Sequence, residues 1–311
     1  MFIVLYLVTR LYNLMDLPLF NDEAFFLWAG RQIRENPLQN IFINFSDGKE
    51  PLFFWLYSPA DSLILLRLFS VIFGLLTFIY FRKITTNVWA SLLFIFSPFL
   101  LFYQRLGMQE TLLTFLLTAA AYYLIKNKFL LAGIFAGLAL MTKTTAIAFL
   151  IPLFIYKFNF KTIIIMSLIY LPVFFGMQSV LSHNSSYVGL IPPGQILTNF
   201  KMAFKGRLDS QGGRGVLGAM APPVIIESFI AKIFFPRYFL FVIPILIIIV
   251  TKYFNKYLLL LFLIPNLILS FQIIKDVKTA NLPYIEKWQY VEAWPAGYGI
   301  KETAEYLKSQ N

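Results

Sequence analysis

Asp22 and Glu23 are adjacent carboxylates that directly follow the first hydrophobic segment of the chain. Charged side chains next to lipid are costly, and they commonly mark functional sites. One interpretation is local, because Asn21 would cap a helix whose dipole favours acids in its first turn. The other is chemical: a carboxylate in a partly dry cleft acts as a general base towards a hydroxyl or amine. The second acid would then hold the acceptor.

Two cations flank other hydrophobic segments. Lys49 lies in the same connecting segment as Asp22 and precedes Glu50-Pro51 and an aromatic run. Its compact ammonium group either is solvated or binds a phosphate, such as that of a lipid carrier. Arg237 stands between Pro236 and Tyr238 at the outer end of a later segment. Snorkelling towards the interface is its ordinary role, but a guanidinium fork also suits phosphate oxygens.

Arg105 and Glu110 bracket a short turn between two hydrophobic segments. They could simply pair and close a helical hairpin. Alternatively, Glu110 adds a carboxylate to the face that carries Asp22. Arg10 and Arg67 lie in or near hydrophobic segments and require partners there, so we expect them to have structural or carboxylate-orienting roles.

The composition is that of an integral membrane protein. Of the 311 residues, 59% are hydrophobic and 13% are charged, against about 25% charged in soluble domains. Apolar runs near the length required for helical spans recur along the chain. We therefore predict an all-α membrane protein, a polytopic bundle of about nine transmembrane helices with amphipathic helices in its external loops. The expected spans are 2–15, 62–81, 87–103, 111–125, 129–142, 144–156, 162–182, 237–251 and 257–274.

The distribution of charge predicts the orientation. The formal net charge is +11, but much of the basic charge lies in short loops, which argues against nucleic-acid binding. With the N-terminus in the cytoplasm, every inner loop is basic and contains no acid, as the positive-inside rule requires. The basic residues of these loops are Arg82, Lys83, Lys126, Lys128, Lys157, Lys161, Lys252 and Lys256. This topology places the candidate site residues outside.

The expected domain organisation has two parts. Residues 1–281 form the transmembrane module, whose long external loops are 16–61 and 183–236. Residues 282–311 form an external segment, the expected start of a soluble domain that continues beyond this sequence. With no cysteine and one histidine, His183, disulfides and multi-histidine metal sites are excluded. We expect no cofactor; a divalent metal is left open, with Asp22, Glu23 and Glu110 as the candidate ligands.

Several motifs resemble those of the GT-C glycosyltransferases. The branch is the family 39 type, which includes protein O-mannosyltransferases and the bacterial aminoarabinose transferases that modify lipid A. The similarity covers nearly the whole chain and is strongest over 9–57 and 100–145. It is carried by Asp22-Glu23, by the run from Lys49 to Leu56, by Arg105 to Phe115, by Leu131 to Lys143, by Arg237-Tyr238 and by Gln289 to Gly299.

The resemblance implies a function and a role for each matching residue. Family members usually transfer one sugar from a polyprenyl-phosphate carrier to an acceptor and invert the anomeric centre. By this resemblance Asp22 and Glu110 are catalytic, with Asp22 as the base. The implied substrate-binding residues are Glu23, Lys49, Arg105 and Arg237. The implied partners are the polyprenyl-phosphate sugar, a protein, lipid or glycan acceptor, and membrane lipid.

Two alternatives belong to other classes of function. A secondary transporter would show inverted repeats and polar residues at mid-membrane, whereas the acids here gather at one outer face. A protein of the same fold could instead bind the carrier lipid without catalysis. The expected location of the protein is the plasma membrane of a prokaryote, with the active site facing outside.

Overall fold

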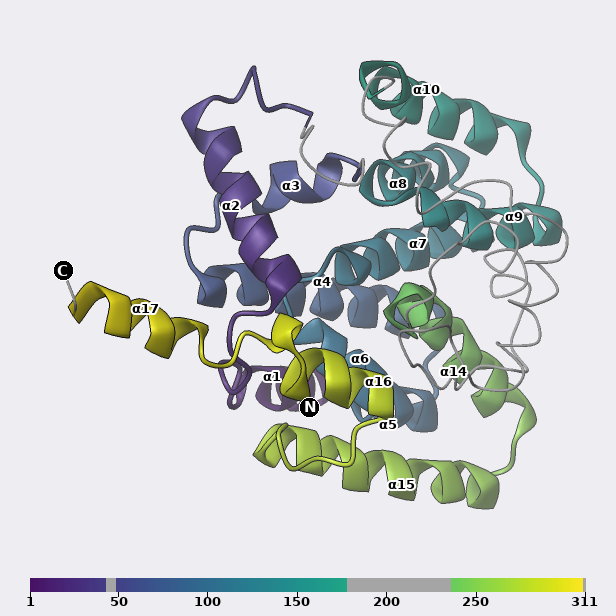
Figure 1. Ribbon diagram of the computed structural model, residues 1–311. Helices are drawn as coiled ribbons and strands as arrows, with labels where there is room; N and C mark the ends of the chain where they lie inside the picture. The colour runs from purple at the N-terminus through teal and green to yellow at the C-terminus, as the bar shows by residue number, and fades with distance from the viewer. Residues whose placement is uncertain (43–48, 178–235, 310–311) are drawn as a thin grey trace, which may run out of the picture.

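The computed structural model describes residues 1–42, 49–177 and 236–309 (Figure 1). Every regular element in these ranges is helical, in agreement with the all-α prediction. The expected loop 183–236, apart from Pro236, and the end of the expected span 162–182 lie outside the described residues. The α-helices are α1 Phe2–Leu11, α2 Asn21–Glu35, α3 Leu52–Tyr57, α4 Leu63–Ile84, α5 Val88–Ile95, α6 Pro98–Gln104, α7 Gln109–Ile125, α8 Phe129–Thr142, α9 Ile147–Tyr156, α10 Phe160–Gly176, α14 Ile243–Tyr253, α15 Lys256–Lys275, α16 Tyr284–Lys287 and α17 Ile300–Ser309.

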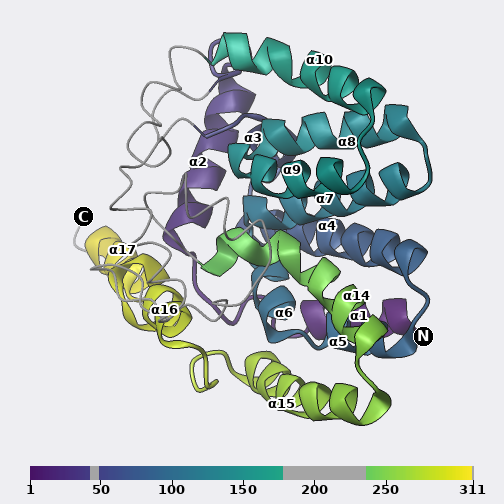
Figure 2. The same cartoon turned by 90° about the vertical axis from the view of Figure 1, so that its right-hand side faces the viewer.

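The helices form a layered stack. Helix α10 packs on α8, α8 on α7, and α7 on α4, while α15 lies at the opposite end of the stack against α5 and α6 (Figures 1 and 2). Helix α2 runs along one side of these layers and contacts α3 and α4. The short 3-10 segment η3, Pro236–Val242, packs against α7. The ends of several layers therefore meet near the start of α2.

Two helices in the described ranges, α4 and α15, are long and apolar enough to cross a membrane. A third span results if α6 and α7, which meet at a bend of 118°, are taken as one broken helix. The other apolar helices have 10–17 residues, below the roughly 20 that a bilayer requires. Among the described residues the structure therefore supports two or three spans, and the larger number of about nine stays a prediction.

Several helices in the structure are shorter than the expected spans, because residues within those spans interrupt the helix. The span 87–103 divides into α5 and α6, where the Ser97 hydroxyl caps the Leu100 amide and Pro98 occupies the first turn. The span 237–251 begins as the 3-10 segment η3 and becomes α-helical only from Ile243. Hydropathy alone does not register these breaks, because the interrupting residues leave the mean hydropathy high.

Helices α8 and α10 approach closely through two glycines one turn apart. A Cβ on Gly133 would lie 2.8 Å from the Thr162 carbonyl oxygen and 2.7 Å from the Ile165 Cβ. On Gly137 it would lie 2.8 Å from the Ile169 Cβ. Small residues spaced by four allow membrane helices to approach backbone to backbone. This contact holds α10 in the stack.

We predict that Gly133→Val separates α8 from α10 and destabilises the protein by about 1–3 kcal/mol, as overpacking does in other cores. The measurement is the thermal unfolding midpoint in detergent. The control is Leu130→Ala on the same helix, because Leu130 is 53% exposed. Equal midpoints for the two variants would contradict the close approach.

Candidate functional site

The first turn of α2 presents its two acids to different surroundings. Consecutive helical residues point about 100° apart, so Asp22 and Glu23 cannot face the same group. Glu23 turns into the bundle. There its Oε2 accepts a hydrogen bond at 3.2 Å from the amide of Phe20, the residue before the helix. Asp22 stays at the edge, with 22% of its side chain exposed.

Glu23 forms a buried ion pair with Arg67 of α4. The Nε and Nη2 of Arg67 lie 2.9 and 2.8 Å from the two carboxylate oxygens, and both side chains are fully buried. The Gly107 amide donates to the same carboxylate at 2.8 Å. Because both oxygens are already engaged inside the protein, Glu23 is placed as a structural residue and not where a substrate would reach it.

Asp22 instead joins a chain of alternating charges. Its carboxylate lies 2.9 Å from the Nη2 of Arg237, whose Nε is 3.7 Å from the carboxylate of Glu110. Glu110 in turn accepts from the Nζ of Lys143 at 2.8 Å. The structure thus brings together three of the predicted site residues, from α2, η3 and α7. It adds Lys143, which follows α8.

Lys49 approaches the same cluster. Its ammonium group lies over the ring of Phe25, 4.9 Å from the centroid, and over that of Phe26 at 5.3 Å. Burial by itself would raise the pKa of Asp22. The charges of Arg237, and then of Lys49 and Lys143, outweigh it and hold the pKa below the usual value. Asp22 is therefore ionised at neutral pH.

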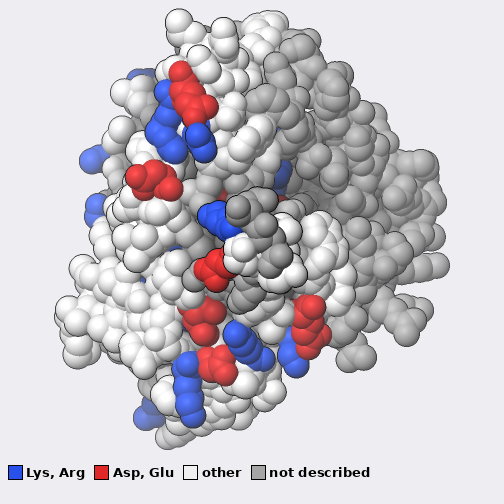
Figure 3. Space-filling view, turned by 60° about the vertical axis from the view of Figure 1, so that its left-hand side comes forward, with Lys and Arg blue, Asp and Glu red and all other residues white. Residues whose placement is uncertain are grey.

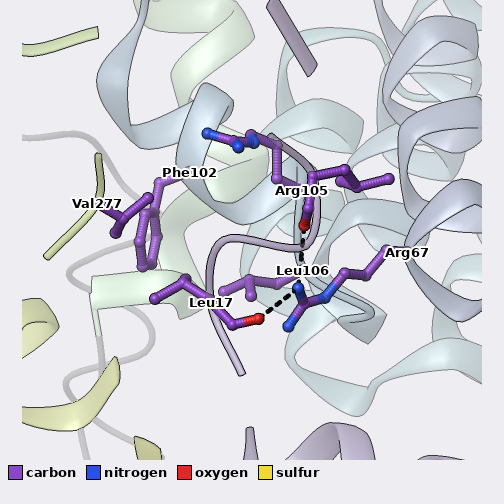
Figure 4. Close-up of a pocket in the computed structure, with 7 residues that line it drawn as sticks. Leu17, Arg67, Phe102, Arg105, Leu106 and Val277 are labelled. Atoms are coloured by element: carbon purple, nitrogen blue, oxygen red, sulfur yellow. Dashed lines mark hydrogen bonds between the residues drawn. The ribbon is translucent and has the colours of Figure 1, made fainter. Parts of the chain in front are cut away.

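Arg105 lies elsewhere. It does not pair with Glu110; it donates to the carbonyls of Ile273, Tyr12 and Asn13 at 3.1, 2.9 and 2.5 Å. With Arg67 it borders a small pocket that is otherwise lined by apolar side chains (Figure 4). There Arg67 donates to the Leu17 carbonyl. The hydrogen bonds of Arg105 thus go to backbone carbonyls and not to Glu110, and the substrate-binding role implied by the resemblance stays a prediction.

Two residues of the cluster were not among the predicted site residues. Lys143 stands in an expected outer turn, and this position on the side of the other candidate residues is the sequence signal that could have identified it. Tyr290 accepts from the Nη1 of Arg237 at 3.2 Å, and it reaches the cluster from the far end of the chain. Lys143 also lies over the Tyr238 ring, 3.7 Å from its centroid.

On the face that carries α2 and α17, acidic and basic side chains are interspersed in a band across otherwise uncharged surface (Figure 3).

Glu50 lies beside the cluster, next to the segment that precedes α9. It accepts from the amide and the hydroxyl of Thr144, which begins the 3-10 segment η1, Thr144–Ala146. Burial raises its pKa to about 7, despite these donors and the nearby charges of Lys143 and Lys49.

Over the described ranges, no three histidine, cysteine or acidic side chains come together as a metal site would require.

Comparisons with known proteins bear on the fold. No family model and no curated protein sequence matches the chain. Its structure is similar to the crystal structure of ArnT from Cupriavidus metallidurans bound to undecaprenyl phosphate, with a TM-score of 0.55 and 13% identity. The match covers 82% of this chain and 60% of ArnT. The chain shares its fold with ArnT.

At 13% identity this similarity shows the fold alone, and the GT-C assignment stays a prediction. The candidate transmembrane helices agree with the predicted membrane location. At this identity the similarity assigns no residue role. Any role of Asp22, Glu110, Lys49 and Arg237 therefore rests on their geometry in this structure.

The Glu23–Arg67 pair generates a stability prediction. Arg67→Met leaves the Glu23 carboxylate buried without its counter-ion, so we expect a loss of about 3–5 kcal/mol in the free energy of unfolding. The matched control is Arg31→Met, which breaks the pair with Glu35 at 2.7 Å, whose side chains are 70% and 47% exposed. That change should leave the free energy of unfolding nearly unchanged, because solvent screens an exposed pair. Similar losses in the two variants would refute the structural role of the buried pair.

Glu50 generates a pH prediction. Between its ordinary pKa of 4.5 and its folded value of about 7, the folded protein binds a proton that the unfolded chain releases. The contribution to stability is therefore fully present below pH 4.5 and is lost as the pH rises towards 7. Glu50→Gln should flatten this decline, by on the order of 2 kcal/mol. The measurement is chemical unfolding at pH 5 and pH 8.

Glu286 should keep part of the slope in that variant, because burial raises its pKa to about 7 as well. The double variant Glu50→Gln/Glu286→Gln is therefore the control for the remaining pH dependence. An unchanged slope in Glu50→Gln would show that its carboxyl group is not protonated in this range.

Proposed function

We propose that this protein is an integral membrane glycosyltransferase that uses a polyprenyl-phosphate sugar as donor. The observation that carries the proposal is the charged cluster at the start of α2. One carboxylate, Asp22, is ion-paired with Arg237, and Lys49 stands near it. Such a cluster offers a base and cations for a phosphate at one place. It occurs on a fold shared with ArnT, whose crystal structure is bound to undecaprenyl phosphate.

The reaction follows from these charges. Asp22 accepts the proton of the acceptor hydroxyl or amine, and the acceptor atom attacks C1 of the sugar in line. The bond between C1 and the phosphate oxygen breaks, its electron pair leaves with the phosphate, and the configuration at C1 inverts. Lys49 and Arg237 stabilise the negative charge that develops on the departing phosphate.

Arg237 has to change partners during this sequence. Without donor, it holds Asp22 and keeps that carboxylate a weak base. A carrier phosphate competes for the same guanidinium group, because phosphate is a well-matched bidentate partner for arginine. Binding of the donor therefore releases Asp22 as the anion arrives, and the base is strengthened only when a sugar is in place. This favours binding of donor before deprotonation of acceptor.

Glu110 acts with Lys143 on the other side of Arg237. It lies 3.7 Å from the Nε of the arginine and 2.8 Å from Lys143. We assign Glu110 to the catalytic machinery as the carboxylate that keeps the guanidinium group in place when Asp22 is released. The two acids and three cations are balanced to within one positive charge, which an arriving phosphate offsets.

The site is proposed to face outwards from a prokaryotic plasma membrane, where an acceptor on a protein, lipid or glycan is available. The basis is the basic inner loops of the expected topology. A secondary transporter is the less favoured alternative, because the charges gather at one edge of the stack, near the start of α2, and the fold is similar to that of ArnT. A non-catalytic carrier-lipid binder would not need the carboxylate of Asp22.

Asp22→Asn tests the proposal. The amide cannot accept the acceptor's proton, so transfer from a polyprenyl-phosphate hexose should fall about 10²–10⁴-fold. Binding of undecaprenyl phosphate should persist, because Lys49 and Arg237 remain. The measurement is incorporation of labelled sugar in membranes that contain the wild type or the variant.

The matched control is Asp61→Asn, an exposed aspartate in the same expected outer loop. It should transfer sugar like the wild type. Normal transfer by Asp22→Asn would remove the base from the mechanism. A wild type that transfers no sugar but binds the carrier would favour the non-catalytic alternative.

A further inference from the structure

The segment after α15 returns to the cluster. Tyr290 lies in a short π-helical turn, Trp288–Glu292, and is 1% exposed. Its ring packs against Phe20, with centroids 4.5 Å apart, and against Phe102 of α6 at 5.1 Å. Phe20 directly precedes α2, two residues before Asp22. The tail thus reaches the helix start that carries the candidate base.

A glycine fixes the tail at the same place. Gly297 has a φ of +80°, which favours glycine, and a Cβ there would lie 2.0 Å from the Leu19 carbonyl oxygen. Any larger residue would push the tail backbone away from Leu19. Leu19 and Phe20 are neighbours in the chain. The contact of Gly297 with Leu19 therefore supports the packing of Tyr290 on Phe20 independently.

The hydroxyl of Tyr290 meets the arginine of the cluster. It accepts from the Nη1 of Arg237 at 3.2 Å, while the Nη2 of the same guanidinium group binds Asp22 at 2.9 Å. One side chain thus contacts Arg237 through its hydroxyl and Phe20, the residue before α2, through its ring. A guanidinium plane held at both Nη atoms has a fixed orientation.

We propose that Tyr290 is a positioning residue that orients Arg237 towards the donor phosphate, so that the tail segment 288–297 is part of the site. This inference rests on the proposed function and gives a role to Tyr290, which was not among the predicted site residues. Tyr290 holds Nη1 while Nη2 passes from Asp22 to the phosphate. Without the hydroxyl, the guanidinium group loses a fixed acceptor and binds the phosphate less well.

Tyr290→Phe tests the proposal, because it retains the ring that packs on Phe20 and removes only the hydroxyl. The full chain in lipid nanodiscs is assayed in two ways. One is the Kd for undecaprenyl phosphate, and the other is kcat and KM for transfer from a polyprenyl-phosphate hexose. We expect Kd and the donor KM to rise about tenfold, the size of one lost hydrogen bond to a charged group. The KM for acceptor should stay unchanged.

The control is Tyr57→Phe. Tyr57 is a buried tyrosine whose hydroxyl pairs with Ser70 at 3.3 Å, away from the cluster. It loses a comparable hydrogen bond and should leave Kd and KM as in the wild type. In an Arg237→Lys background, Tyr290→Phe should add less than about twofold, because the group it positions is already gone.

Each outcome is decisive. A Tyr290→Phe protein that binds carrier and transfers sugar like the wild type overturns the positioning role while leaving the proposed function intact. So does an equal penalty in the wild-type and Arg237→Lys backgrounds, because that would mean that the Tyr290 hydroxyl acts independently of Arg237. A wild type that neither binds undecaprenyl phosphate nor transfers sugar overturns the proposed function, and this inference with it.

Discussion

The buried pair between Glu23 and Arg67 is the interaction on which the rest of the site depends. Two charges without access to water are costly apart and must remain together. The pair therefore fixes the start of α2 against α4, and the Gly107 amide ties the same carboxylate to the turn before α7. Because Glu23 must point inwards, Asp22 is directed to the edge of the stack, where Arg237 and Lys49 can reach it.

The cluster around Asp22 is suited to an anion because its charges do not quite cancel. Two acids, Asp22 and Glu110, face three cations, which are Arg237, Lys143 and Lys49. The net charge of the cluster is therefore one positive unit. Arrival of a phosphate restores the balance, and the ion pair that holds Asp22 is then no longer the best partner for the arginine. The same arrangement keeps the base weak while no donor is bound. Binding and activation are thus linked by one competition for a guanidinium group.

Sequence patterns anticipated the helical class and the grouping of Asp22, Glu110 and Arg237, because hydropathy and loop charge report directly on membrane helices and on their outer ends. They assigned Glu23 and Arg105 to the same site. That assignment could not be checked locally, since the partner of Glu23 lies on another helix, 44 positions along the chain. Tyr290 lies in a stretch that carries the resemblance, but its role could not be predicted, because its contacts with Phe20 and Arg237 arise only when the tail folds back.

Three buried arginines explain how irregular backbone is tolerated beside this site. A bilayer supplies no water to helix ends, so carbonyls that leave a helix must find donors within the protein. Arg10, Arg67 and Arg105 supply them at the breaks between helices. Their acceptors are the carbonyls of Ile95 for Arg10, of Leu14, Leu17 and Pro18 for Arg67, and of Tyr12, Asn13 and Ile273 for Arg105. Arginine suits this task because its donors spread over a planar fork and it remains charged. The segment that presents Asp22 can leave the helical stack because these guanidinium groups satisfy the backbone that leads to it.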